Sequence, residues 1–277
     1  MAEKNGLSIN FHQTFRPERE YLSQILKVAQ KNESFSNEQI TDETGIPTGK
    51  SSGKVIPTIN YAKGMYLIET KKNKDSIHMS LTPLGEMILI EDKYFSESLT
   101  QWVLHLFLSR KSGGAKIWYK VFCESTDVLG NRFSRVELDN FLESFFGKKN
   151  RSLIGPLVTM YNSSSSFNLA KCLYEKDNEL IRNIAPLKDE YIWGYAAIFA
   201  HYWETFYSDK KQLTLDEFEE QTSFFKLMGW DEQQMHECIN KFSELKIIEA
   251  DRQMGSPIIS IIKDEISIVK NIFSLLV

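Results

Sequence analysis

The order of the elements predicted for residues 17–92 constrains the fold of this chain more than any other feature of its sequence. Apolar side chains at helical spacing predict a first helix over residues 17–30. Ser36 is suited to begin a second, short helix, and Gly45 is suited to end it in the left-handed conformation. A third helix is predicted over residues 51–64, so three helices follow one another closely.

A hairpin is predicted directly after the third helix. The segments MYLIE and IHMSLTPLGEMIL flank the charged tip TKKNKDS, and they predict two strands and a closing helix that begins near Thr82 and Pro83. Three helices followed by a hairpin are the order of a winged helix-turn-helix. We therefore predict such a domain, with an N-terminal arm, for residues 1–92.

The rest of the chain predicts two further parts. In residues 93–188, apolar runs and a helix that begins at Ser134 with Glu137 as its capping-box partner predict a helical domain, and the serine-rich segment 162–167 predicts a flexible loop. Residues 189–277 begin with an aromatic helix and continue as helix, helix, strand, strand, the order of a second winged-helix-like module. We find no residue-by-residue repeat between the two halves. The predicted fold class is mainly α with small β-hairpins.

Composition excludes several classes of protein. Hydrophobic residues make up 42% of the 277 residues, as expected for a globular protein with a real core. The three cysteines are odd in number, far apart and without a C-x-x-C pair, so neither a disulfide framework nor a thiolate zinc site is supported. Because the N-terminus lacks an apolar signal segment and no long apolar run is free of charge, we expect a cytoplasmic protein that does not span a membrane.

The sequence offers no strong catalytic or metal-binding pattern. The stretch GIPTGKSSGK has three residues where a phosphate-binding loop requires four. A G-x-S-x-G motif is absent, and the five histidines lack metal-binding spacing. We therefore predict that the protein is not an enzyme and has no catalytic residue, metal or cofactor. An alternative is an enzyme whose site forms from scattered residues around His105, or around His201 and Glu204.

Positive charge is concentrated where the predicted domain would meet DNA. Residues 50–80 contain six lysines and only two acids, Glu69 and Asp75, in a chain of net charge −4. The start of the third helix and the hairpin tip are suited to phosphate contacts, and two residues of that helix are suited to base edges. No arginine lies on this helix, so weak or shape-led binding of double-stranded DNA is expected. The candidate DNA-binding residues are Lys50, Ser51, Ser52, Lys54, Asn60, Tyr61, Lys63, Lys71, Lys72 and Lys74.

The second half of the chain has the opposite charge. Residues 204–249 contain 11 acidic residues and five lysines, so DNA would repel this segment and a protein partner is expected. The alternative function that follows is a protein-protein adaptor or scaffold that uses its winged-helix modules to bind partners.

Three blocks of the sequence resemble a bacterial family that is catalogued only as a domain of unknown function, number four thousand and seven. The first block is FHQTFRP at residues 11–17, continued by Tyr21 and Leu22 where the family has a Trp-Leu pair. The others are LTPLG at residues 81–85 and ESLTQWVLH at residues 97–105. The resemblance is good over residues 9–125 and vague beyond.

The resemblance implies a gene neighbourhood and no activity. Such proteins look like neighbours of sulfur-transfer and DNA phosphorothioation genes in bacterial anti-phage defence. The function expected is therefore a non-enzymatic DNA-binding or accessory component of such a system, with protein partners from the same operon. The resemblance also makes four residues candidates for an interface patch, although they can equally dock the arm onto the core. They are His12, Thr14, Phe15 and Arg16.

Overall fold

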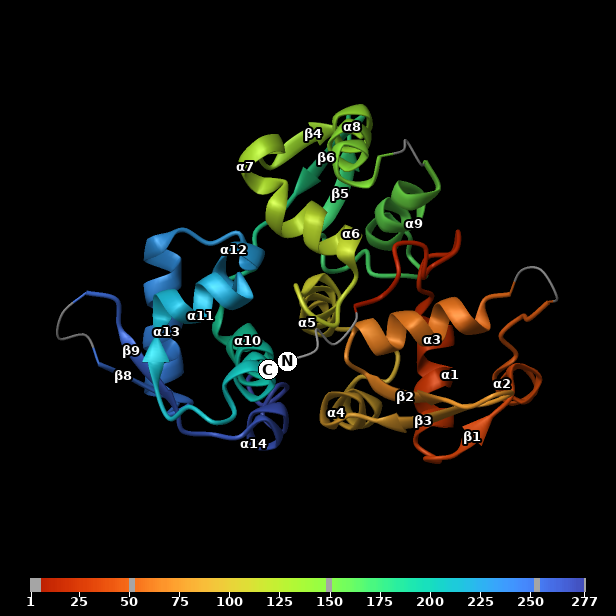
Figure 1. Cartoon of the computed structure of the whole chain (residues 1–277), viewed down its shortest axis with the longest axis horizontal. Coiled ribbons are helices and arrows are strands. Elements are labelled where there is room, and N and C mark those ends of the chain that lie inside the picture. Colours follow the sequence, from red (N-terminus) through yellow and green to blue (C-terminus); the bar gives the residue numbers. More distant parts are fainter. Residues whose placement is uncertain (1–5, 50–52, 148–150, 252–254, 277) are drawn as a thin grey trace. The chain divides into compact units, whose positions relative to one another are not determined.

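The computed structural model describes residues 6–49, 53–147, 151–251 and 255–276. Contacts divide the chain into two units that meet in sequence between Asn183 and Ile184, and each is described here by itself. Helices predominate in both units, and three small antiparallel sheets accompany them (Figure 1). None of the described helices combines the length and the apolar character needed to cross a membrane.

The first unit begins with the predicted order of helices and hairpin, which we call the first module. Its elements are α1 (Arg19–Ala29), β1 (Ser34–Phe35), α2 (Asn37–Thr44), α3 (Val55–Gly64), β2 (Ile68–Lys72), β3 (Ile77–Leu81) and α4 (Pro83–Glu91). Ser36 forms the predicted capping box with Gln39, and Gly45 ends α2 with φ of 69°. The short strand β1 was not predicted, and it completes a sheet of order β1-β3-β2.

The closing helix of the first module is fixed to the end of α3 by the LTPLG block. The Thr82 hydroxyl accepts a hydrogen bond from the amide of Gly85 at 3.0 Å and donates one to the carbonyl oxygen of Tyr66 at 2.6 Å. A Cβ atom on Gly85 would lie 1.9 Å from the carbonyl oxygen of Leu67. Glycine is therefore required here by the close approach of two backbones.

The second part of the first unit contains a sheet as well as helices. Its elements are α5 (Ser98–Ser109), α6 (Lys116–Tyr119), the π-helix η1 (Lys120–Glu124), α7 (Thr126–Leu129), β4 (Arg132–Ser134), α8 (Arg135–Phe146), α9 (Arg151–Asn162), β5 (Leu173–Lys176) and β6 (Glu179–Arg182). The strands form a sheet of order β4-β6-β5. We call residues 132–182 the middle module. The prediction of a helical domain for residues 93–188 was incomplete, because three strands lie among its helices.

The second unit has the predicted order of an aromatic helix followed by helices and a hairpin. Its elements are α10 (Asp189–Tyr207), β7 (Leu213–Thr214), α11 (Leu215–Thr222), α12 (Phe224–Met228), α13 (Glu232–Glu244), β8 (Ile248–Asp251), β9 (Ile258–Ile261) and α14 (Glu265–Val269). The strands form a sheet of order β7-β9-β8. We call residues 213–261 the last module.

The three modules share a local pattern. In each, a short strand is followed by a capped helix, then by one or two further helices and a hairpin whose second strand pairs with the short one. The sequences from a residue within the short strand to the first turn of the capped helix are FSNEQI, FSRVEL and LTLDEF, which begin at residues 35, 133 and 213. Each has a buried apolar residue before the cap and another at the fourth helical position, which is a hydrophobic staple. A short repeat therefore exists, and our sequence comparison missed it.

Candidate nucleic-acid interface

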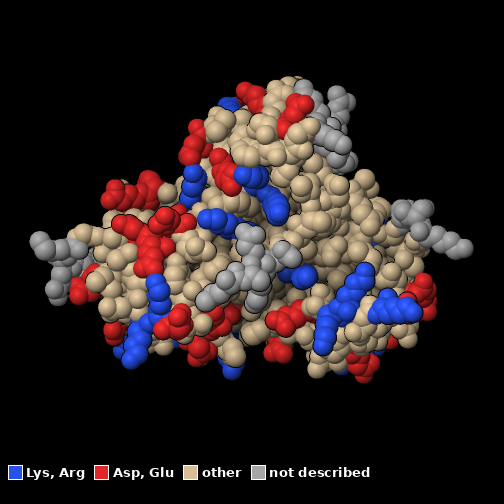
Figure 2. Space-filling view, viewed as in Figure 1, with Lys and Arg blue, Asp and Glu red and all other residues tan. Residues whose placement is uncertain are grey.

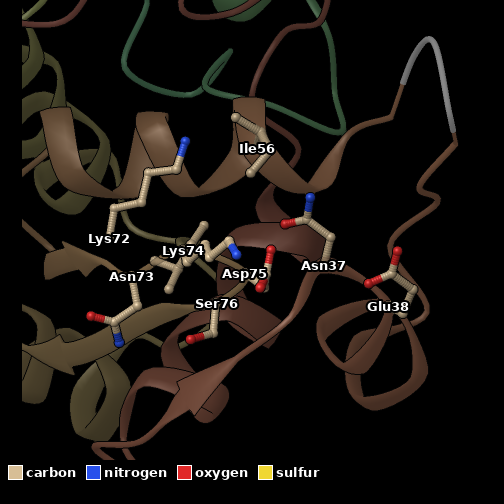
Figure 3. A pocket seen from close by; sticks show the side chains of 9 residues that line it. Asn37, Glu38, Ile56, Lys72, Asn73, Lys74, Asp75 and Ser76 are labelled. Carbon is tan, nitrogen blue, oxygen red and sulfur yellow. The ribbon is translucent and has the colours of Figure 1, made fainter.

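A shallow groove of about 470 Å³ lies between the tip of the first hairpin and the starts of α2 and α3. Figure 3 shows Lys72, Lys74 and Asp75 between the hairpin and the first turn of α3, where Ile56 lies. The residues that line it are Asn37, Glu38, Ile56, Lys72, Asn73, Lys74, Asp75, Ser76 and Ile77. The groove therefore brings two of the predicted wing lysines together.

The backbone of the hairpin decides where its lysines point. The amide of Asn73 donates to the carbonyl oxygen of Ser76 at 2.9 Å, which closes the tip. Because side chains alternate along a strand, Lys72 lies on the face of β2 that is buried at Ile68, and Lys71 lies on the opposite face. The hairpin therefore carries positive charge on both of its faces.

Four of the predicted lysines are exposed, and within the described residues none of them makes an ion pair: Lys63, Lys71, Lys72 and Lys74. Figure 2 shows positive side chains over the part of the surface that carries β2 and β3, with negative ones at its borders. One of the two acids that line the groove, Glu38, has its carboxylate bound at the start of α2. Its own backbone amide and then the Ser36 hydroxyl, which donates at 3.0 Å, lower the pKa of this carboxyl.

Helix α3 is less available than the sequence suggested. Tyr61 is fully buried, and its hydroxyl donates to the carbonyl oxygen of Phe15 at 3.1 Å. Burial raises the pKa of this hydroxyl well above its ordinary value. The side-chain amide of Asn60 donates to the carbonyl oxygen of Phe11 at 3.3 Å. Tyr61 therefore cannot reach a base edge, and the half-buried Asn60 already uses its amide to hold the N-terminal arm.

Lys54 also has a structural role. Its ammonium lies 2.7 Å from a carboxylate oxygen of Glu18, and it lies over the rings of Tyr21 and Phe15 at 5.1 and 5.9 Å from their centroids. This lysine joins α1, the arm and the start of α3, so its charge is already compensated. The remaining predicted contacts, Lys50, Ser51 and Ser52, lie outside the described residues.

The arm packs against the body of the first unit through the residues that carry the family resemblance. His12 is fully buried beside Phe11 and Trp118, and neither ring nitrogen has a hydrogen-bond partner among the described residues. Burial lowers the pKa of His12 from 6.5 to about 4, although the nearby backbone of Gln13 opposes part of this shift. Thr14 remains exposed. Figure 1 shows the arm passing between α3 and the helices α6 and α9.

The serine-rich segment after α9 holds the other end of the arm. A guanidinium nitrogen of the half-buried Arg16 donates to the Ser165 hydroxyl at 3.3 Å, and one of Arg19 donates to the carbonyl oxygen of Ser164 at 2.7 Å. The buried Ser166 hydroxyl donates to the carbonyl oxygen of Pro17 at 2.5 Å. Residues 162–167 were expected to be a flexible loop, but these hydrogen bonds attach the segment to the arm. We call residues 162–167 the serine clasp.

The residues of the enzyme alternative belong to different units, His105 to the first and His201 and Glu204 to the second. His105 is buried in the first unit, where its Nδ1 atom lies 2.6 Å from the Tyr161 hydroxyl and burial lowers its pKa to about 3. In the second unit, the Nδ1 atom of His201 lies 3.7 Å from a carboxylate oxygen of Glu265, and burial raises the pKa of Glu204. Within the described parts of the chain, no three His, Cys, Asp or Glu side chains are placed to hold a metal ion.

Comparison with known proteins identifies the fold and the family. The fold is similar to a crystal structure of magnesium ion-bound SspB, with a TM-score of 0.69 and 14% identity over 96% of this chain and 86% of that one. A second SspB crystal structure gives a TM-score of 0.67 at 14% identity over 98% and 88%. No curated protein matches the chain. The family model described as "Protein of unknown function (DUF4007)" matches residues 10–156, and the chain therefore belongs to this family.

Proposed function

We propose that this protein binds double-stranded DNA through its first hairpin, as a component of a bacterial DNA phosphorothioation or related anti-phage defence system. The first part rests on the charge of the hairpin, and the second on the gene neighbourhood that the family resemblance implies. We propose a binding role without a catalytic centre of the protein's own.

One observation carries the proposal. Lys71, Lys72 and Lys74 lie within four consecutive positions, are exposed, and make no ion pair within the described residues. Three cations without an ion-pair partner on a short hairpin repel one another, and a polyanion that binds there would remove this repulsion. Lys54, by contrast, is compensated by Glu18 inside the fold.

We infer that the first module is a winged helix-turn-helix whose wing is the first hairpin. The order α1, α2, α3, β2, β3 and the sheet order β1-β3-β2 support this interpretation. The similarity to SspB supports the fold of the whole chain, since it covers 96% of the residues. At 14% identity it supports no more than the fold.

The test is a titration of the full chain with short duplexes, with and without sulfur in the backbone, at about 50 mM and about 200 mM salt. We expect affinity to fall steeply with salt. Changing Lys71, Lys72 and Lys74 together to Gln should weaken binding at least tenfold, because about three phosphate contacts are lost. The matched control changes three separated exposed lysines, Lys27, Lys116 and Lys176, to Gln, and its affinity should stay close to that of the natural chain.

Two results contradict the proposal. Equal losses in the two variants would mean that net charge matters and the hairpin does not. Cleavage or nicking of the duplex in Mg²⁺, prevented by a chelator, would contradict the non-enzymatic role, and the magnesium ion in the related SspB structure makes this control necessary.

A second function, an adaptor for partner proteins, is favoured by the surface of the second unit. Ile258 of β9, Ile266 of α14 and Ile262 between these elements are 39 to 53% exposed, in a unit rich in acidic residues. Exposed apolar residues near charge are typical of protein interfaces. The adaptor role predicts that products of neighbouring genes are captured without DNA and that the three hairpin substitutions leave this capture intact. Loss of capture after nuclease treatment would contradict it.

A further inference from the structure

We propose that the first hairpin enters the minor groove of duplex DNA and meets the phosphates on both of its sides, while α3 stays out of the major groove. This inference rests on the proposed function and specifies the surface of DNA that is bound. It replaces the usual expectation for a winged helix-turn-helix, in which a recognition helix reads base edges in the major groove.

The first step is the burial of α3. Seven of its ten residues are buried: Val55, Pro57, Thr58, Ile59, Tyr61, Ala62 and Gly64. The remaining three, Ile56, Asn60 and Lys63, form one stripe at helical spacing, and the amide of Asn60 is bonded to the arm. A single exposed lysine at the end of this stripe leaves α3 almost no polar group to read bases.

The second step is that the arm is firmly attached over this helix. Carbonyl oxygens of Phe11 and Phe15 accept hydrogen bonds from Asn60 and Tyr61, and the serine clasp holds the arm at Pro17. The rings of Phe11 and Tyr61 also pack edge to face, with centroids 4.8 Å apart. Uncovering α3 would expose these apolar rings and leave the arm's carbonyl groups without partners. DNA binding cannot supply replacement partners for groups buried in the core.

The third step is the two-faced charge of the hairpin. Lys72 and Lys74 line the groove beside Ile56, and Lys71 points to the opposite face, where His78 is its neighbour across the strands. The minor groove of B-form DNA is about 6 Å wide and lies between two rows of phosphates, so a hairpin tip that enters it has anions on both sides. A hairpin edge with cations on both faces therefore matches a site that has anions on both sides.

The sequence of the hairpin favours duplex over single-stranded DNA. Proteins that bind single strands stack bases on aromatic rings, and residues 68–81 contain no Phe, Tyr or Trp. Contacts from lysine to phosphate fix position and carry little sequence information. The expected ligand is therefore a duplex of any sequence, with a preference for a narrow minor groove where the negative potential is strongest.

The experiment fills one groove of the duplex at a time and uses the full chain. One duplex carries glucosylated hydroxymethylcytosine, which occupies the major groove, and an A·T-rich duplex is saturated with netropsin, which occupies the minor groove. We expect glucosylation to change the affinity less than about twofold and netropsin to weaken it at least about tenfold, since only the minor groove is used. Spermine at a matched charge concentration controls for the charge of netropsin, and it should weaken binding less than netropsin does.

The outcomes separate this inference from the function on which it rests. Loss of binding on glucosylation, with netropsin no more effective than spermine, would overturn the minor-groove inference and keep DNA binding. An absence of binding to every duplex would overturn both. A further variant, Lys71→Gln, removes charge from the face that points away from the groove. Its affinity should fall about as much as that of Lys72→Gln, and an unchanged affinity would overturn contact on both faces.

Discussion

The first and last modules have sheets of the same strand order, but the segments at these two places in the chain carry opposite charge. Both contain a capped helix after a short strand, and both contain a hairpin whose second strand pairs with that short strand. Residues 50–80 nevertheless contain six lysines and two acids, whereas residues 204–249 contain 11 acids and five lysines. Modules with the same strand order can therefore present surfaces of opposite charge, and we expect the surface side chains to select the partner.

Reversal of the charge of the first hairpin should have the largest effect on DNA binding. The change of Lys71, Lys72 and Lys74 together to Glu should weaken duplex binding at least about a hundredfold, because attraction to phosphate becomes repulsion. The same reversal at Lys27, Lys116 and Lys176 should change the affinity by less than about threefold. Fluorescence anisotropy with a labelled duplex measures both. Similar losses would remove the distinction between the hairpin and the rest of the surface.

The first module also differs from the last in the N-terminal arm that covers α3. Low pH should release this arm. The pKa of His12 falls from 6.5 to about 4 on folding, so the unfolded chain binds this proton at higher pH than the folded chain. The contribution of neutral His12 to the free energy of unfolding is complete above pH 6.5, the unfolded pKa. It is lost as the pH falls from 6.5 towards the folded pKa of about 4. About 2 kcal/mol should be lost at about pH 5, and His12→Leu should abolish this part of the pH dependence.

The control for this prediction is Phe11→Leu, which trims the neighbouring ring without removing a titratable group. It should destabilise the protein equally at about pH 7 and about pH 5. Hydrogen exchange of peptides from α3, measured in the full chain, reports the local free energy of opening. An unchanged pH dependence in His12→Leu would show that this histidine does not couple the arm to acid.

The contrast between Lys54 and the hairpin lysines can be sharpened by a single substitution. Lys54→Gln should reduce the stability of the first module by about 1.5 kcal/mol, because a partly buried ion pair and two ring contacts are lost. Its duplex affinity should remain close to that of the natural chain. A loss of affinity similar to that of Lys72→Gln would mean that Lys54 contacts DNA.

The smallest predicted effect tests what the modules have in common. Ser36, Ser134 and Thr214 each accept a hydrogen bond from the amide three residues later. Replacement of each by Ala should destabilise its own module by about 1 kcal/mol. Hydrogen exchange of peptides from α2, α8 and α11 measures the three effects separately. Widely different values would show that the N-cap hydrogen bond does not stabilise the three modules equally.

The local elements could be predicted from the sequence because their signals are local. The caps at Ser36 and Ser134 and the glycine at position 45 mark helix ends within a few residues of the side chains that form them. The hairpin β5-β6 also had such a signal, which we missed. Asp177 and Asn178 both have positive φ, of 53° and 65°, in the two-residue turn that these residue types favour.

The candidate site could be predicted only in part because burial depends on distant residues. The exposed hairpin lysines follow from a polar tip between two apolar strands. Asn60 and Tyr61 are unavailable for contact with DNA because they bond to the arm, which lies 46 to 49 residues earlier in the chain. One local sign was present, since α3 carries apolar residues on nearly all sides, and such a helix is usually buried.

The decisive measurement of DNA binding by the hairpin is the dependence of duplex affinity on salt, for the natural chain and for Lys71→Gln, Lys72→Gln and the double variant. If both faces of the first hairpin meet phosphates, the slope of log affinity against log salt should become shallower by about 0.9 for each single substitution and by about twice that for the double one. A slope that is the same in all four proteins would contradict the account.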